Sequence, residues 1–278
     1  MIRALGLVLL IAVLPARADD LKPSKNFGPY VPSPQSVVAD MLRYAEVGPQ
    51  DFLIDLGSGD GRIVLTAAKI FGARGFGVEI KEDLVRRSNE AAQKEGLADR
   101  VKFLKQDLFK TDMSQATVIT MYLLPDTVNL LKDKFLSELK PGTRIVSHDY
   151  PLTGWIPEKY VQMDLEDKVQ ISGVTTTLIY LYVVPAKVAG RWSAQMPPAV
   201  SKQPATLQLK QQLTRVSGSA QLDGREVALE DVKLRGDRIS FRLSGRRGEF
   251  SGQVKGSSIE GVMENGGAKA PWSATLGG

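Results

Sequence analysis

A glycine-rich turn directly after an apolar run constrains this chain most. The run is Phe52-Leu53-Ile54, and the turn is Asp55-Leu56-Gly57-Ser58-Gly59-Asp60-Gly61-Arg62. Apolar residues then recur at helical spacing from Ile63 to Phe71, so the pattern predicts a strand, a tight loop and a helix. Glycines let such a loop adopt positive φ and approach a ligand, and a helix N-terminus offers free N–H groups. We therefore expect the loop to hold a nucleotide-like ligand.

The glycine spacing narrows the kind of ligand. A dinucleotide-binding fingerprint has G-x-G-x-x-G, whereas this turn has G-x-G-x-G, with Asp55 two residues before the first glycine. Arg62 and Ile63 follow Gly61, where a phosphate-binding P-loop has Lys and then Ser or Thr. Both differences favour a ligand without phosphate. The pattern Asp-x-Gly-x-Gly-x-Gly resembles motif I of class I methyltransferases, which use S-adenosyl-L-methionine.

The first 18 residues are typical of a secretory signal peptide. Arg3 provides a positive start, the segment from Ala4 to Leu14 is apolar, and Ala16-Arg17-Ala18 fits a cleavage site. The run is shorter than the roughly 20 apolar residues of a membrane span. We expect cleavage after Ala18 and export, with the bacterial periplasm as destination and no transmembrane span in the mature chain. An uncleaved signal that tethers the protein to the membrane is the alternative.

Charge and composition exclude several classes of function. Residues 186–278 contain 14 Lys or Arg and 8 Asp or Glu, whereas residues 19–185 have a net charge of −3. The basic residues are scattered among acidic ones, unlike the concentrated stripe of a nucleic-acid interface, so no nucleic-acid partner is expected. The chain has no cysteine, which removes disulfides, thiolate catalysis and cysteine-based zinc sites. No metal site is predicted.

The segment 33–185, which follows a proline-rich lead-in at 19–32, alternates strand and helix patterns. This alternation predicts an α/β domain with a doubly wound, mostly parallel Rossmann-like sheet. A first helix is expected to begin with Ser33 or Ser36 as its N-cap and to end near Val47. The next elements are expected as strands at 52–56, 75–80, 101–106, 117–123 and 143–148, and helices near 61–71, 81–95 and 126–139. Two β-rich runs, 168–172 and 175–184, predict an antiparallel hairpin about Gly173-Val174.

The segment 190–278 has short alternating runs and glycine turns, which predict a small all-β meander or barrel. Six strands are expected at 205–209, 215–222, 225–234, 238–244, 249–254 and 258–264. We expect Trp192 and Trp272 to pack together and close this domain. Its turn rhythm resembles the small lipocalin-like β-domains of exported bacterial proteins. Because no histidine or carboxylate pair in it indicates catalysis, we interpret it as a stabilising or docking module.

Polar residues end the predicted parallel strands, and ligands of open α/β sheets bind beyond those ends. The five ends carry, in order, Asp55 with Gly57, Glu79, Asp107, Tyr122 to Pro125, and His148 with Asp149. A methyltransferase cofactor gives three of these ends a role.

Glu79 is placed to accept hydrogen bonds from both ribose hydroxyls, although an acid at the start of a helix is the alternative. Asp107 is placed to accept from the adenine amino group with Leu108 or Phe109 against the ring, and a simple turn residue is its alternative. Asp55 is expected to orient the loop and the methionine amino group. The loop backbone is expected to meet the methionyl part, so the remaining predicted cofactor residues are Gly57, Ser58, Gly59 and Gly61.

Six segments indicate a more specific family than the glycine-rich turn does alone. They are Pro29-Tyr30-Val31-Pro32-Ser33, the turn from Asp55 to Arg62 with Ile63-Val64, Gly77-Val78-Glu79-Ile80, Asp107-Leu108-Phe109, Met121-Tyr122-Leu123-Leu124-Pro125, and Pro141-Gly142-Thr143-Arg144-Ile145-Val146-Ser147-His148. Together they resemble the protein-lysine methyltransferase family that includes the ATP synthase c-subunit and adenine nucleotide translocase lysine N-methyltransferases. The likeness covers about residues 28–185. It implies methyl transfer from S-adenosyl-L-methionine to an amine, foremost a protein lysine. The alternatives are a small exported amine, a lipid headgroup, or a binding module without turnover.

Methyl transfer is an in-line displacement, so catalysis is mainly alignment and desolvation. A lysine must arrive neutral, which requires a lowered pKa or a proton acceptor. We predict that Tyr122 lines the transfer channel, with Leu123 and Pro125 on the substrate side. This strand end lacks the Asn/Asp-Pro-Pro-Tyr signature that grips planar amides or base amines, which favours an aliphatic amine.

Four further residues are candidates with open roles. His148, beside Asp149, fits either a proton acceptor or a structural hydrogen-bonding residue. Tyr30 is expected to close over the cofactor as a lid, with an exposed linker residue as the alternative. Trp155 is expected to line the substrate cleft, with a cover for the sheet as the alternative.

Overall fold

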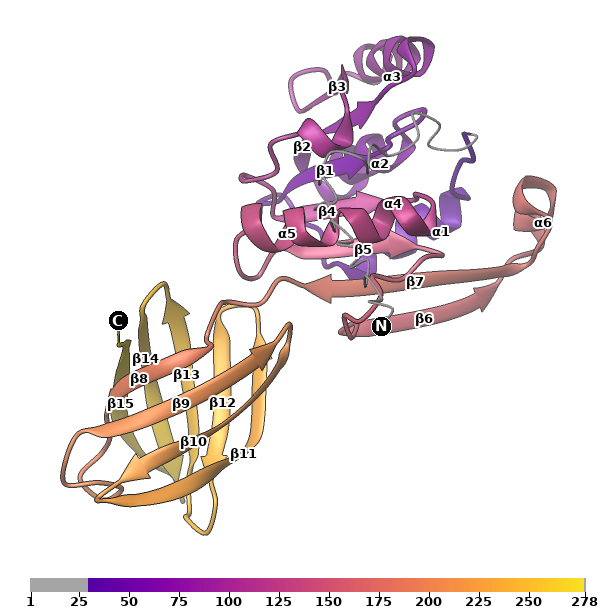
Figure 1. Cartoon of the computed structure of the whole chain (residues 1–278). Coiled ribbons are helices and arrows are strands. Elements are labelled where there is room, and N and C mark those ends of the chain that lie inside the picture. Colours follow the sequence, from indigo (N-terminus) through magenta and orange to yellow (C-terminus); the bar gives the residue numbers. More distant parts are fainter. Residues whose placement is uncertain (1–29, 278) are drawn as a thin grey trace, which may run out of the picture.

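The structure is a computed structural model that describes residues 30–277, apart from the side chains at positions 167, 171 and 172. The predicted signal peptide at 1–18 and most of the proline-rich lead-in lie outside these residues. The described chain forms a seven-stranded sheet flanked by helices and, after it, a closed β-barrel (Figure 1). None of the helices in this range is long and apolar enough to cross a membrane.

The sheet has the strand order β3-β2-β1-β4-β5-β7-β6. Its parallel strands are β1 (Phe52–Leu56), β2 (Arg74–Glu79), β3 (Val101–Lys105), β4 (Val118–Met121) and β5 (Arg144–His148). Strand β7 (Thr176–Val183) runs antiparallel to both β5 and the edge strand β6 (Lys159–Asp164). This arrangement confirms the predicted Rossmann-like sheet with a terminal antiparallel hairpin.

Helices cover both faces of the sheet, which explains why the central strands β1 and β4 are buried along nearly their whole length. Helices α1 (Gln35–Tyr44), α2 (Arg62–Phe71) and α3 (Glu82–Lys94) cover one face, and α4 (Pro125–Leu130) and α5 (Lys132–Glu138) the other. Because side chains alternate along a strand, Leu53 joins the first core and Ile54 the second. A short 3-10 turn, η2 (Leu108–Lys110), follows β3.

Two local predictions in this sheet domain are wrong. Helix α1 starts after Pro34 without any side-chain cap, because the Ser33 hydroxyl hydrogen-bonds His148 instead. The segment 168–172 is not a strand but part of helix α6 (Glu166–Ser172), which ends at Gly173 with φ +78°. Strand β6 lies further upstream, so α6 connects the two hairpin strands. The helical turn brings Lys168 back onto Asp149, a long-range contact that the local β-rich pattern does not reveal.

The barrel has the strand order β10-β11-β12-β13-β14-β15-β8-β9. Its strands are β8 (Gly190–Gln195), β9 (Ala205–Gln212), β10 (Arg215–Leu222), β11 (Arg225–Arg235), β12 (Arg238–Leu243), β13 (Glu249–Lys255), β14 (Ser258–Asn265) and β15 (Ala268–Leu276). Pairing of β8 with β15 closes the barrel, and these two strands are additional to the six expected.

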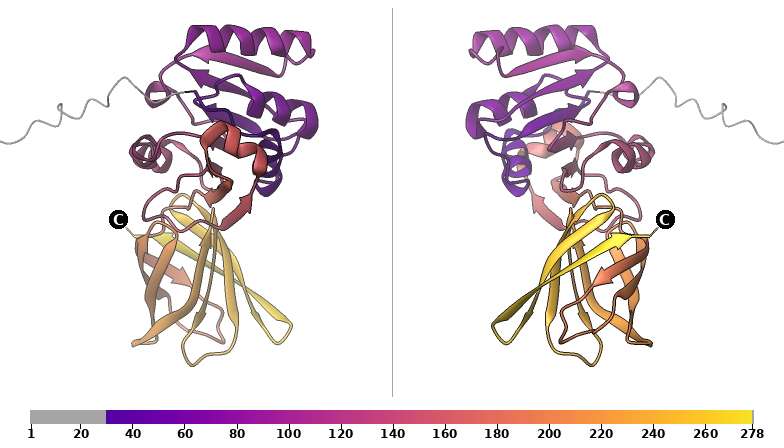
Figure 2. Two further views of the ribbon diagram at one scale, coloured as in Figure 1. Left: turned by 90° about the vertical axis from the view of Figure 1, so that its right-hand side faces the viewer. Right: turned by 90° about the vertical axis from the view of Figure 1, so that its left-hand side faces the viewer.

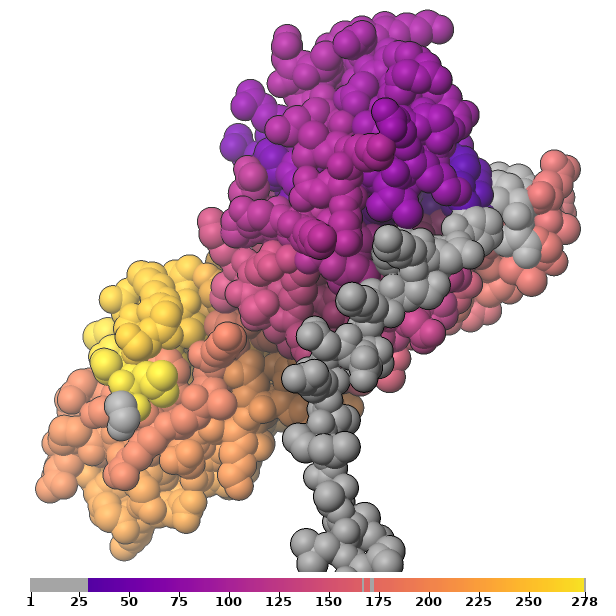
Figure 3. All heavy atoms as spheres, turned by 45° about the horizontal axis from the view of Figure 1, so that its top comes forward, coloured from indigo at the N-terminus to yellow at the C-terminus, as the bar shows by residue number. Residues whose placement is uncertain are grey.

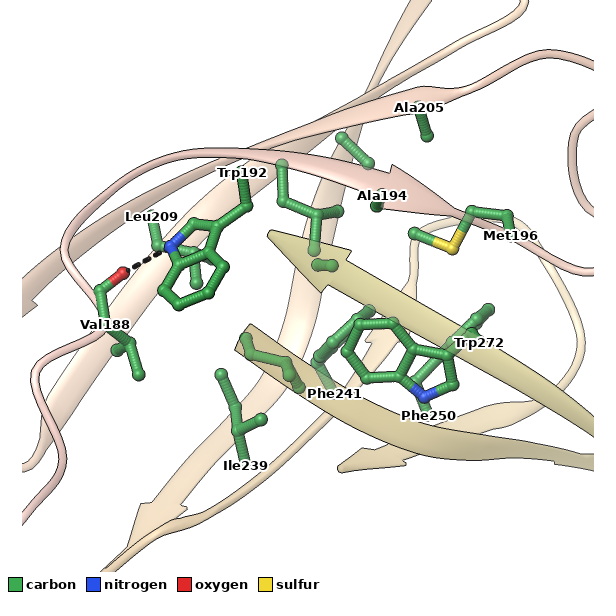
Figure 4. Packing of buried hydrophobic residues seen from close by; sticks show 14 of the residues in the cluster. Val188, Trp192, Ala194, Met196, Ala205, Leu209, Ile239, Phe241, Phe250 and Trp272 are labelled. Atoms are coloured by element: carbon green, nitrogen blue, oxygen red, sulfur yellow. Dashed lines mark hydrogen bonds between the residues drawn. The ribbon is translucent and has the colours of Figure 1, made fainter. Parts of the chain in front are cut away.

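Aromatic side chains fill the barrel interior (Figure 4). Trp272 contacts Phe241 and Phe250 edge-on, with ring centroids 5.4 and 5.9 Å apart. Trp192 is buried in the same core, and its indole N–H donates to the Val188 carbonyl. Both tryptophans are thus core residues on the two strands that close the barrel.

The barrel contacts one edge of the sheet domain. The Ala186 amide donates to the Gly236 carbonyl, and Arg235 pairs with Glu158 at 2.7 Å. Gly236 lies close to Gly142, just before β5, so this is the edge opposite the carboxyl ends of the parallel strands. Figures 2 and 3 show the barrel as a separate lobe below the sheet domain. The barrel therefore lies away from the edge where ligands of such sheets bind.

Candidate active site

A pocket of ≈ 830 Å³, open mouth included, lies at the carboxyl ends of β1, β2, β3 and β4. A segment at residues 30–33, which we call the strap, forms another wall. Eight of the predicted cofactor and channel residues line the pocket: Tyr30, Asp55, Gly57, Ser58, Gly59, Glu79, Leu108 and Tyr122. Leu123, predicted on the substrate side, lines it as well. One cavity thus contains residues from four strand ends.

The glycine loop packs so tightly that side chains are excluded from it. Gly57 and Gly59 have φ of +76° and +54°. A Cβ at Gly59 would lie 2.4 Å from the Tyr30 ring, and one at Gly57 would lie 2.7 Å from Leu123. The absent side chains let the strap and the end of β4 approach the loop and form the pocket walls.

The loop amides were expected to meet the methionyl part of a cofactor, but several already have partners. Those of Gly57 and Ser58 donate to the Val78 carbonyl, and that of Gly59 donates to Glu79 Oε2 at 3.2 Å. The Ser58 hydroxyl, in contrast, is buried in the pocket wall without a hydrogen-bond partner among the described residues. The Ser58 side chain lies against Gly77 on β2, where a Cβ would be only 2.5 Å from Ser58 Oγ, so the hydroxyl is enclosed between the loop and β2.

Two carboxylates flank the loop. Asp55 is 2% exposed and accepts a hydrogen bond from Thr120. Burial raises the pKa of Asp55 to about 7, partly opposed by that hydrogen bond and reinforced by the charges of Asp60 and Glu79. Glu79 Oε1 accepts from the amides of Ile80 and Lys81, which fixes the carboxylate at the pocket wall.

The strap is fastened to the loop by polar contacts. Arg62 forms an ion pair with Asp60 and donates to the Ser33 carbonyl at 2.7 Å. Burial and then the neighbouring Asp60 carboxylate raise the pKa of the Tyr30 hydroxyl to about 12. Tyr30 therefore lies over Gly59 as part of the wall, a position that fits the expected lid.

His148 lies behind the pocket wall. It is fully buried, its Nδ1 is 2.8 Å from Ser33 Oγ, and its ring contacts the Tyr122 ring at a tilt of 34°, with centroids 3.9 Å apart. Burial lowers the pKa of His148 to about 4, because the nearby Asp149 only partly offsets it and Lys168 adds to it. His148 is thus neutral near pH 7 and links the strap to the Tyr122 ring.

Asp149 and Lys168 lie beside this histidine. Lys168 is 2% exposed, and its Nζ lies 2.8 Å from both carboxylate oxygens of Asp149. Although burial opposes it, His148 and the hydrogen bond from Lys168 lower the pKa of Asp149. Burial, followed by the Asp149 carboxylate, raises the pKa of the Tyr122 hydroxyl. Sequence reasoning missed Lys168, because nothing local marks it as buried.

Four further predicted site residues do not line the pocket. Asp107 caps η2 by accepting from the Phe109 amide, although its neighbours Gln106 and Leu108 do line the cavity. Gly61 precedes α2, and Pro125 is the first residue of α4.

The fourth is Trp155, which is only 3% exposed and packs on Tyr182 in the core. Its expected position in the substrate cleft is therefore wrong. The apolar core between the sheet and α4 and α5 takes up the indole, and its N–H has no hydrogen-bond partner in the described chain.

Comparison with known proteins identifies the family. The ANTKMT methyltransferase domain matches residues 55–159. A protein-lysine N-methyltransferase from Saccharolobus islandicus is 41% identical over 157 residues, which cover 56% of this chain and 93% of the archaeal protein. The chain belongs to the protein-lysine N-methyltransferase family. This finding confirms the resemblance drawn from the six sequence segments.

Two further relatives match the same part of the chain. The ATP synthase c-subunit lysine N-methyltransferase of Xenopus laevis is 32% identical over 47% of this chain and 57% of its own length. An RNA methyltransferase from Salinibacter ruber, known from a crystal structure in complex with S-adenosyl-L-homocysteine, is 43% identical in sequence to this chain. It covers 57% of this chain and 96% of its own, with a TM-score of 0.51. These matches establish the sheet domain as an S-adenosyl-L-methionine-dependent methyltransferase.

The pocket fits this cofactor in chemistry. The glycines let Tyr30 and Leu123 approach the loop as close walls of the pocket, and Asp55 and Glu79 offer carboxylate oxygens. The cofactor has a cationic amino group and ribose hydroxyls, which are hydrogen-bond donors that carboxylates accept. Tyr122 and Leu123 line the same cavity at the end of β4.

Proposed function

We propose that this protein transfers a methyl group from S-adenosyl-L-methionine to the ε-amino group of a protein lysine. The observation that supports it best is the end of β4, where Tyr122 and Leu123 line the pocket close to the glycine loop. Their side chains are an aromatic ring with one hydroxyl and an aliphatic wall. Such a wall suits a slender aliphatic amine, which needs desolvation and alignment more than base-specific hydrogen bonds.

We assign roles to the residues of this chain as follows. Glu79 and Asp55 bind the ribose and amino ends of the cofactor, and Tyr30 covers it. Bound cofactor supplies a methyl group attached to a sulfonium sulfur. After transfer of the methyl group, the rest of the cofactor leaves as a neutral thioether. Tyr122 positions the acceptor nitrogen in line with that methyl group. Because His148 is neutral and buried, we propose that it holds Tyr122 and the strap in place. We do not assign it the role of proton acceptor for the substrate lysine.

RNA is the alternative class of methyl acceptor, because the Salinibacter relative is named an RNA methyltransferase. Two features of this chain favour an amine. Its residues 19–185 carry a net charge of −3, which opposes binding to a phosphate backbone. The end of β4 reads Tyr122-Leu123-Leu124-Pro125, without a side-chain amide or carboxylate for a base edge.

Transfer of radiolabelled methyl groups tests the acceptor. The full chain is incubated with labelled cofactor and, separately, with an envelope protein extract, extracted lipid and total RNA. We expect label in protein, released as methyl-lysine after acid hydrolysis, and little label from the Glu79→Ala variant. Glu82→Ala, an exposed acid three residues further on, is the matched control and should label normally. Label in RNA or lipid alone would overturn the lysine proposal, and cofactor binding without label in any fraction would favour a binding module.

We also propose that the protein is exported after cleavage following Ala18. This rests on the positive, apolar and small-residue regions of residues 1–18. N-terminal sequencing of the protein from cells should give Asp19 as the first residue. A first residue of Met1 would contradict cleavage and favour the membrane-tethered form.

A further inference from the structure

Lys168 is a buried cation that the proposed reaction has not yet used. It lies on α6, the connection of the β6–β7 hairpin, which projects from the sheet in Figure 1. Its Nζ donates to Asp149 Oδ1 and Oδ2 at 2.8 Å each and also to the Thr176 carbonyl. A lysine this deeply buried is rarely found unless its charge is compensated, and here the Asp149 carboxylate compensates it.

Asp149 is fixed from several sides. Its backbone has φ +63°, a left-handed conformation that is uncommon for a residue other than glycine. Its amide donates to the Leu178 carbonyl at 2.7 Å, and the Leu178 amide returns a hydrogen bond to Oδ1 at 3.0 Å. With Lys168 added, the carboxylate has one defined position beside β7.

The fixed carboxylate faces the pocket wall from behind. The Tyr122 ring lies against His148 with centroids 3.9 Å apart, and His148 Nε2 is 3.5 Å from Asp149 Oδ1. The Asp149 carboxylate is close enough to raise the pKa of the Tyr122 hydroxyl, after burial, so the hydroxyl can donate to it. A tyrosine hydroxyl that donates its only proton to a carboxylate keeps its lone pairs for another donor. The oxygen of Tyr122 can then accept an N–H of an amine that enters the pocket, which directs the nitrogen lone pair elsewhere.

We propose that Lys168 is a positioning residue for methyl transfer: it fixes Asp149, which orients the Tyr122 hydroxyl toward the incoming amine. This inference rests on the proposed amine acceptor. Lys168 also cancels the charge of Asp149, so that the carboxylate does not hold the acceptor as a paired ammonium ion. The nucleophile is the neutral amine, so a compensated carboxylate favours reaction over a stable ion pair.

The charged and titratable groups around Asp149 are those whose pKa values a substitution of Lys168 can change. They are His148 on β5, Tyr122 at the end of β4, Tyr150 after β5, Tyr180 on β7 and Lys168 itself. Among them His148 is the useful reporter, because it is the single histidine of the chain. Its imidazole Nε2 lies 3.5 Å from Asp149 Oδ1.

The test compares Lys168→Met, which removes the charge, with Lys168→Arg, which keeps it. Lys159→Met, on the exposed β6 of the same hairpin, is the matched control. The tag-free full chain is titrated by NMR of the histidine ring without acceptor, and methyl transfer to a lysine-containing protein is measured against pH. Calorimetry gives the affinity for S-adenosyl-L-homocysteine.

In Lys168→Met we expect the His148 pKa to rise by about one unit, because the Asp149 charge is no longer compensated. We expect kcat to fall about tenfold or more with cofactor affinity within about twofold, and the pH profile to shift upward. Lys168→Arg should restore most of kcat. A Lys168→Met/Tyr122→Phe double variant should lose less than the product of the two single losses, because the two changes act in part through the same hydroxyl.

An unchanged His148 titration or an unchanged pH profile in Lys168→Met would overturn the proposal. If Lys168→Met does not fold, Lys168→Arg still tests the proposal. A tenfold loss of kcat in Lys168→Arg, which retains the charge, would contradict a role through charge. Failure of the proposed function looks different: the wild-type chain itself would then transfer no label to lysine.

Discussion

Asp55 at the end of β1 accepts a hydrogen bond from Thr120 on the neighbouring β4, with 2.7 Å between Oδ1 and Oγ1. This is the one side-chain hydrogen bond of the Asp55 carboxylate within the described structure, and burial raises its pKa to about 7. In the protein without cofactor, Asp55 therefore keeps its proton well above the pH at which it ionises in the unfolded chain.

We expect this proton to leave when the cofactor binds, because the cofactor amino group brings a positive charge to the carboxylate. Calorimetry with S-adenosyl-L-methionine at pH 6, in buffers of different ionisation enthalpy, should show proton release from the wild type and less from Asp55→Asn. Equal proton release from both proteins would contradict the assignment of Asp55 to the amino group.

The same pKa predicts how stability depends on pH. A carboxyl whose pKa is raised in the folded state, from 3.8 to about 7, stabilises the fold at low pH and loses that contribution as pH rises through this window. His148, with its lowered pKa, has the opposite effect as pH falls below about 6.5, so the comparison must isolate Asp55.

Urea unfolding of the cofactor-free wild type and Asp55→Asn between pH 4.5 and pH 7 provides that comparison. The free energy of unfolding of the wild type should fall relative to the variant by a few kcal/mol as pH rises across this range. A constant difference would mean that Asp55 is ionised throughout.

Glu79 should contribute strongly to cofactor affinity. Its Oε1 and Oε2 accept the amides of Lys81 and Gly59, so the carboxylate cannot turn away from the pocket. Removal of hydrogen bonds to a charged group costs about 1.5–3 kcal/mol, so Glu79→Ala should weaken binding of S-adenosyl-L-homocysteine by about tenfold to a hundredfold. Glu82→Ala, on the exposed start of α3, should bind normally, and equal affinity of both variants would remove Glu79 from the site.

Sequence pattern could predict the sheet and the outline of the site because both follow from local rules. Parallel strands place their carboxyl ends at one edge, so Asp55 and Glu79 were expected to line the same cavity, as they do. Contacts between distant segments could not be predicted in this way. Ser33 reaches His148 across 115 positions, and Lys168 is buried only because α6 folds it onto Asp149.

The barrel shows the same limit. Hairpin strands carry their own turn signals, and the six expected strands lie between such turns. Strands β8 and β15 pair across the length of the domain, so that Trp192 faces Leu276, and no short pattern marks that pairing.

Gly59 is a loop position where a side chain should displace the strap. Its φ is +54°, and a Cβ would lie 2.4 Å from the Tyr30 ring, so Gly59→Ala must displace the lid. Gly96→Ala is the matched control, since Gly96 also has positive φ but nothing lies within 4 Å of its Cβ position. Both substitutions should cost about 1 kcal/mol through the backbone.

The two variants should differ in cofactor affinity. Only Gly59→Ala should weaken it, by about tenfold, since only this variant disturbs a wall of the pocket. Adding Tyr30→Ala to Gly59→Ala relieves the clash, so the double variant should bind no worse than Tyr30→Ala alone. An additive loss in the double variant would show that Gly59→Ala weakens cofactor binding by a route other than displacement of Tyr30.

The position of the barrel leads to the last prediction, which concerns Gly236. This residue has φ +59°, and its Cβ position lies 3.0 Å from the Gly142 Cα in the sheet domain. Gly236→Val should push the β11–β12 turn away from the sheet and expose the connection at 184–190 to limited proteolysis. Gly224→Val, in the β10–β11 turn with positive φ and open space, has the same backbone cost without the contact. Because the barrel docks at the edge opposite the pocket, both variants should bind S-adenosyl-L-homocysteine within about twofold of wild type, whereas accelerated cleavage should occur only in Gly236→Val. A loss of affinity confined to Gly236→Val would show that barrel docking shapes the pocket through the sheet.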